Sequence, residues 1–153
     1  MTLQARLPAP TVFRSAVAAI FAVVSMFLLA LGTATAAPKG ISLELNDAQT
    51  VAGACIGSFV LKNDLGHTLD RFQLDLFVFG DDGVIKLRSN IDLAPVRGDK
   101  TTVISFRILP EPCAAVARVL VNDIPLCRAQ SGNTLDCLSG LTVSSRNRIR
   151  LEK

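Results

Sequence analysis

The chain has few of the side chains that carry out chemistry. It contains one histidine, His67, and no Gly-x-Ser-x-Gly motif in its 153 residues. A Ser-His-Asp triad needs a nucleophile and an orienting acid beside the imidazole, and that motif presents the nucleophile in one large class of hydrolases. Asp64 and Asp70 are near His67 in sequence, but such spacing is common in solvated loops. We therefore expect no catalytic residue and no enzyme; a hydrolase that uses His67 is the alternative.

Ligands for metal ions and cofactors are also scarce. Both methionines lie before residue 37, and His67 is the only imidazole. A copper carrier needs a set of soft sulfur and imidazole ligands, which the rest of the chain does not supply. Asp47, Asp81 and Asp82 offer oxygen atoms, but no spacing gathers them around one calcium ion. We expect neither a metal nor a cofactor.

The stretch Gly80–Gly83, with the sequence Gly-Asp-Asp-Gly, invites comparison with a calcium loop. An EF-hand loop has acidic ligands at alternate positions and a glutamate at its twelfth position. Counting from Asp81, the twelfth residue is Asp92, and Ile85 and Leu87 stand where ligands are required. Aspartate and glycine tolerate the backbone angles of tight hairpins. The stretch is therefore predicted to be a turn between two strands.

Clustered positive charge is also lacking. Of the 16 basic residues, Arg6 and Arg14 lie before residue 37, which leaves 14 basic against 13 acidic residues in the rest of the chain. Binding to nucleic acid or to an anionic membrane surface needs a concentrated basic face. A net charge of +1 gives no support for nucleic acid as a partner.

One long apolar run is present, from Ser15 to Gly32, and it follows Arg6 and Arg14. The small residues Ala34–Ala36 come after it, so the order matches an export signal that is cleaved after Ala36. An uncleaved membrane anchor is the alternative, because the run of 18 residues approaches the roughly 20 that span a bilayer. We expect residues 1–36 to be a signal peptide, residues 37–153 to form one domain, and the protein to be periplasmic or secreted.

All four cysteines lie after the predicted cleavage site. An even number of cysteines in an oxidising compartment indicates two disulfides, for which three connectivities exist. We favour Cys127 with Cys137, which closes a short loop, and Cys55 with Cys113, which ties an early strand to the end of a later one. No C-x-x-C motif is present, so a thioredoxin-like redox role is not expected.

Short segments of alternating or continuous apolar residues, separated by turn residues, predict strands throughout the rest of the chain. The pattern indicates an all-β, antiparallel immunoglobulin-like sandwich of about seven strands, with a small barrel as the alternative. A turn-rich stretch is expected between residue 45 and Gly53, and a helical turn at 113–117. The predicted strands are 41–45, 55–61, 69–79, 84–88, 101–109, 119–121, one within 136–145, and a short one around Ile149 and Leu151.

The run Phe59–Ile85, followed by Asp92–Phe106, resembles the FxLYD-type immunoglobulin-like domains of small exported bacterial proteins. In that family a strand ending in Asn precedes a strand that finishes in an aromatic-x-Asp-x-Gly hairpin, and a Leu-x-Pro turn introduces the next strand. The matching residues here are Asn63, Phe79, Asp81, Gly83, Leu93 and Pro95. The chain departs from the pattern in having Gly80 between the aromatic residue and Asp81, and in its cysteine-bearing extension Cys113–Lys153. The resemblance covers less than half of residues 37–153.

The resemblance implies a binding or structural role with an unknown protein or envelope partner, and a membrane contact only if the leader is not cleaved. Strand addition at an exposed sheet edge is the expected mode of binding. The tripeptide Arg97-Gly98-Asp99 spells an integrin-recognition motif, but three residues carry little specificity and a turn explains the glycine. The charged segment 146–150 is expected to be solvated.

Overall fold

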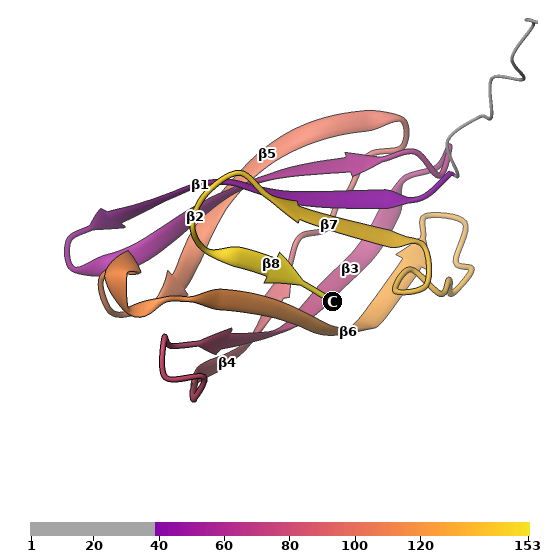
Figure 1. Ribbon diagram of the computed structural model, residues 1–153. Helices are drawn as coiled ribbons and strands as arrows, with labels where there is room; N and C mark the ends of the chain where they lie inside the picture. Colours follow the sequence, from indigo (N-terminus) through magenta and orange to yellow (C-terminus); the bar gives the residue numbers. More distant parts are fainter. Residues whose placement is uncertain (1–38) are drawn as a thin grey trace, which may run out of the picture. The chain divides into compact units, whose positions relative to one another are not determined.

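The computed structural model describes residues 39–153, which belong to one compact unit beginning at Pro38. The predicted signal peptide, residues 1–36, lies outside the described residues. Within the described part, no helix has both the length and the apolar character needed to cross a membrane. The domain is built from strands, as the alternating pattern predicts (Figure 1).

Eight strands and one 3₁₀ turn make up the described part of the chain (Figure 1). They are β1 (Ile41–Val51), β2 (Ala54–Asn63), β3 (Leu69–Phe79), β4 (Ile85–Asp92), β5 (Lys100–Leu109), the 3₁₀ turn η2 (Cys113–Ala115), β6 (Arg118–Ala129), β7 (Leu141–Ser145) and β8 (Arg150–Glu152). Pro110 follows β5 directly and Pro112 comes two residues later. Proline cannot donate to a sheet ladder, which accounts for the end of that strand.

The strands form two four-stranded sheets, in the orders β5-β2-β1-β7 and β4-β3-β6-β8. This confirms the all-β sandwich, and two separate sheets exclude the barrel alternative. Most strand pairs are antiparallel, as predicted, and the two exceptions lie at the ends of the sheets. The pairs β1–β7 and β6–β8 are parallel: β7 runs beside β1, and β8 beside β6, each in the same direction as its neighbour.

The core lies between the sheets and is filled by one face of each strand. In β3, Phe72, Leu74, Leu76 and Val78 are all buried, as their shared face predicts. The aromatic ring of Phe59 in β2 stacks on that of Phe106 in β5, with 4.5 Å between ring centroids. Burial of this continuous apolar set is the main stabilising term in a domain of this size. The other fully buried large side chains are Ile41, Leu43, Leu45, Leu61, Leu69, Leu109, Leu141 and Ile149.

Strands β1 and β6 extend furthest beyond their predicted bounds, and β2 and β4 also continue, to Asn63 and Asp92. Strand β1 continues to Val51 through the expected turn-rich stretch, because a register shift between Leu45 and Asp47 lets the polar half keep its pairing with β2. Strand β6 was expected at residues 119–121 only, yet it reaches Ala129. Its pairing with β3 shifts register near Asp75, so the alternation on which the prediction depended is interrupted there.

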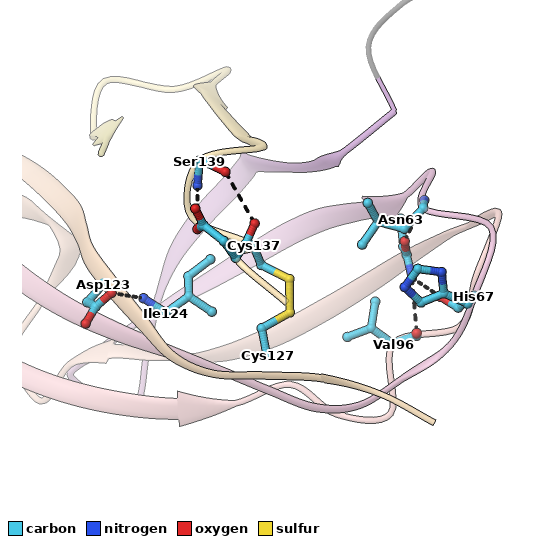
Figure 2. The surroundings of a disulfide bond; sticks show 10 residues. Asn63, His67, Val96, Asp123, Ile124, Cys127, Cys137 and Ser139 are labelled. Carbon is cyan, nitrogen blue, oxygen red and sulfur yellow. Dashed lines mark hydrogen bonds between the residues drawn. A yellow bond between two sulfur atoms is a disulfide. The ribbon is translucent and has the colours of Figure 1, made fainter. Parts of the chain in front are cut away.

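Both disulfides join the cysteines that the sequence analysis favours. Cys55 in β2 bonds to Cys113 in η2, across 58 residues of sequence, and Cys127 in β6 bonds to Cys137 across 10 residues. The first bond ties the exit of β5 back to the sheet that β5 belongs to. The second holds the loop between β6 and β7 against β6 (Figure 2).

Candidate functional site

The edge strand β5 is the surface best prepared to bind another chain. Among the strands of residues 39–153, β5 pairs with β2 alone, so one side of its backbone is left without a ladder. Its register with β2 runs without a shift from Lys100 to Arg107, and the only irregularity lies at the end of the strand near Leu109. An unpaired edge of this length with a regular register is a template for strand addition.

The outward face of β5 carries an apolar side chain at its centre. Val103 is 67% exposed and pairs with the half-buried Val60 of β2. The next outward residue, Ser105, shares a hydrogen bond of 2.9 Å between hydroxyl groups with Ser58. The inward residues Ile104 and Phe106 are only half-buried, so an added strand would cover apolar surface on both faces of the sheet.

The other long edge, β4, is protected by charge. Lys86, Arg88 and Asp92 are exposed along it, and charged side chains on an edge strand oppose pairing with a further strand. Two of these charges are already paired, because Lys86 binds Asp82 at 3.2 Å and Arg88 binds Asp75. The remaining edges are short, since β7 has five residues and β8 has three.

A buried carboxylate holds β4 to its neighbour. Asp75 of β3 is 3% exposed, and its two oxygens accept hydrogen bonds from Nε and Nη2 of Arg88 at 2.9 and 3.0 Å. Nδ2 of Asn122 donates to the same carboxylate at 2.9 Å. The bond from Arg88, followed by that from Asn122, holds the pKa of Asp75 below its usual value. The guanidinium of Arg88 also lies 5.1 Å from the ring centre of Phe77.

His67 lies at a pocket, and the aspartates near it in sequence bind other residues. The pocket, of about 180 Å³, is lined by Leu65, His67, Leu135 and Cys137 among others. Asp64 binds Lys62 at 2.6 Å instead of the imidazole. Asp70 is held by Arg128, whose hydrogen bonds lower the pKa of that carboxyl. Within residues 39–153, no hydrogen bond to the His67 ring is made.

The loop that carries His67 is fixed through its main chain. Asn63 is fully buried, and its Nδ2 donates to the carbonyl oxygens of His67 and Val96 at 3.0 and 3.3 Å (Figure 2). Its Oδ1 accepts from the amide of Leu65 at 3.0 Å. The asparagine therefore satisfies three main-chain groups of two loops, which is a structural task and explains why a polar side chain is buried here.

Gly80–Gly83 is a turn, as predicted. The amide of Gly80 donates to the carbonyl of Val84 at 3.0 Å, and Gly83 has a φ of 75°. Asp82 accepts from the amide of Val84, and this bond lowers the pKa of Asp82. No group of three histidine, cysteine, aspartate or glutamate residues able to hold a metal ion is found in the described part of the chain.

The two remaining sequence candidates are surface turns. Gly98 of the Arg97-Gly98-Asp99 tripeptide lies so close to the main chain of His67 that a Cβ would come within 2.7 Å of it. Close approach, rather than recognition, therefore accounts for this glycine. The arginines of the segment 146–150 are exposed to solvent, as predicted, whereas Ile149 between them is buried and Arg146 binds Glu44 at 2.8 Å.

Sequence reasoning missed two features of the site. The burial of Asp75 leaves no signal, because it occupies an outward position between two inward leucines. Val103 does leave one, because it is the single aliphatic residue on the polar face of 101–107.

The chain was compared with protein-family models, with curated proteins and with solved structures, and none of the three comparisons gives a match.

Proposed function

We propose that the protein is an exported, non-enzymatic binding domain of the periplasm or cell exterior that recognises its partner by strand addition at β5. The observation that carries the proposal is the long, regular and uncharged middle of this edge, with Val103 exposed at its centre. Two disulfides support an oxidising compartment. The resemblance to FxLYD-type domains supports a binding role over a catalytic one.

Site-specific photocrosslinking in the cell envelope tests this proposal. A photoreactive residue at Val103 is expected to yield an adduct of defined mass, which mass spectrometry identifies. Val51 provides the matched control, because it is also an exposed valine, at 53%, but lies at the hairpin end of β1. Adducts at both positions, or at neither, would contradict recognition through β5.

Retention in the membrane by an uncleaved Ser15–Gly32 segment is the second candidate, favoured by the apolar character of that run. Fractionation with N-terminal sequencing separates the two. A soluble chain that begins at Ala37 supports the exported domain, whereas a full-length chain in the membrane fraction supports the anchored component. Either result leaves the β5 edge available for binding.

A further inference from the structure

We propose that the strand that pairs with β5 is β5 of a second copy of this chain, arranged antiparallel about a two-fold axis at Ser105. This rests on the proposed function and names its partner. The two copies would join their β5-β2-β1-β7 sheets into one continuous sheet. A two-fold contact of this kind needs a self-complementary strand, and the residues of β5 meet that condition.

The inward side chains of β5 fix the register. With Ser105 opposite Ser105, Ile104 of each copy faces Phe106 of the other. Both residues are half-buried in one chain, and aromatic residues opposite β-branched residues are favourable cross-strand pairs. Moving the axis to Ile104 places Phe106 opposite Thr102, and moving it to Val103 places Phe106 opposite Lys100. Of these three axes, the one at Ser105 is the one that places both apolar side chains opposite apolar partners.

The pairing of the outward side chains is also favourable in this register. Arg107 of one copy faces Val103 of the other, so the aliphatic stem of the arginine lies over the exposed valine. Neither Arg107 nor Lys100 then faces a like charge. Within residues 39–153, neither residue forms an ion pair with an acidic side chain, so pairing with a second copy breaks no salt bridge.

Between Thr101 and Phe106 the edge lacks the devices that prevent such pairing, and its exposed charges, Lys100 and Arg107, lie on either side of this stretch. Proteins guard edge strands with inward charges, prolines, central bulges or short length. Strand β5 has 10 residues, its inward positions from Thr102 to Ile108 are uncharged, and its prolines come only after it ends. A second copy would pair with the free backbone groups of this edge, which otherwise favour aggregation. The other edges, β4, β7 and β8, are protected by charge or by short length.

Cysteine crosslinking of the full chain tests the register. Opposite residues in an antiparallel pair have Cα atoms about 4.5 to 5.5 Å apart, within the range that a disulfide spans. Ser105→Cys is expected to form a covalent dimer on mild oxidation, because the native cysteines of the described chain are all paired. Val103→Cys is expected to stay monomeric on a non-reducing gel, since its copy would lie about 13 Å away along the strand.

A charge substitution provides a second measurement. Ser105→Lys places two lysines opposite each other and is expected to raise the dimer dissociation constant about tenfold or more in sedimentation experiments. Ser144→Lys is the matched control, because it adds the same charge to the outward face of β7 at the other edge of the sheet, and it is expected to leave the constant unchanged.

A native chain that stays monomeric, or a Ser105→Cys chain that forms no covalent dimer, overturns the second copy as partner. If the photoreactive residue at Val103 meanwhile captures a different protein, strand addition at β5 stands and only the identity of the partner is wrong. If it captures nothing, the proposed function fails together with the dimer.

Discussion

The two sides of the sandwich end in different ways. On one side, which we call the closed side, β7 and β8 complete the two sheets and are joined by residues 146–149 (Figure 1). Ile149 in this link is 1% exposed. On the other side, the open side, the sheets end in β4 and β5, with the half-buried residues Leu87, Ile91, Ile104 and Phe106.

Hydrogen bonds reinforce this difference. On the closed side, Oγ of Ser145 donates to the carbonyl of Ile149 at 2.6 Å, and the amide of Arg146 donates to the carbonyl of Leu45 at 3.0 Å. Arg148 reaches the carbonyl of Cys113. The open side depends instead on the Asp75–Arg88 pair and on the disulfide that holds the exit of β5. A buried link with main-chain hydrogen bonds therefore secures the closed side, whereas a disulfide and a buried carboxylate secure the side that we propose binds.

Removing the disulfides is expected to have the largest effect. Replacing Cys55 and Cys113 by alanine frees a loop of 58 residues, which lowers the free energy of unfolding by about 4 kcal/mol in the chain-entropy model. The same change at Cys127 and Cys137 frees a loop of 10 residues and is expected to cost about 3 kcal/mol. Urea denaturation measures both. An equal or reversed order would show that the tether of β5 is not the more important bond.

Truncating one isoleucine on each side compares how much side-chain packing contributes to stability on the two sides. Ile149→Ala on the closed side removes a fully buried side chain and is expected to cost about 2 to 5 kcal/mol of unfolding free energy. Ile91→Ala on the open side is the control and should cost less, because Ile91 is only half-buried in one chain. The urea midpoints of the two variants measure the difference. If Ile91→Ala destabilises the chain more than Ile149→Ala, the closed side is not the better packed one.

Acid is expected to weaken the open side through Asp75. The folded chain holds the pKa of Asp75 below its usual value, so the unfolded chain takes up the proton first as the pH falls. The stabilisation is complete above the unfolded pKa, about 3.9, and is lost as the pH drops through the folded pKa. Asp75→Asn should therefore reduce the difference in urea midpoint between pH 7 and pH 3. An unchanged difference would assign the acid sensitivity to other carboxylates.

The smallest effect on stability is expected at the edge itself. Val103→Thr keeps the shape and β-branching of a side chain that is 67% exposed, so the free energy of unfolding should change by about 0.5 kcal/mol or less. Association through β5 should nevertheless weaken, because a hydroxyl replaces a methyl group in the contact. Sedimentation and denaturation of the same sample separate the two effects, and a parallel loss of both would show that Val103 stabilises the single chain.

Strands with an uninterrupted pattern could be predicted closely from sequence. The bounds of β3, Leu69–Phe79, match the prediction, and β5 differs by one residue, since it begins at Lys100. The second half of β1 and most of β6 could not be predicted, because register shifts break the alternation there. The parallel pairing of β7 and β8 also left no pattern, since it depends on which strand lies beside them rather than on their own residues.

The candidate site could be predicted in kind but not in place. An exposed sheet edge follows from an open sandwich, but which strand occupies the edge is a property of topology. His67 and the aspartates drew attention because of their chemistry, yet Asp64 and Asp70 are held by basic neighbours rather than by His67. Asp75, whose partners lie 13 and 47 residues away, could be recognised only once β3, β4 and β6 were side by side.

The parallel pairing of β7 with β1 has a consequence for the order of assembly. Ile41 pairs with Leu141, and Leu45 with Ser145, so the first described strand meets its last neighbour a hundred residues later. Contacts between residues so distant in sequence slow folding, because a large loop must close before they form. A chain synthesised from its N-terminus would therefore keep β1 without one neighbour until residues 141–152 have followed, and would complete its first sheet only at the end.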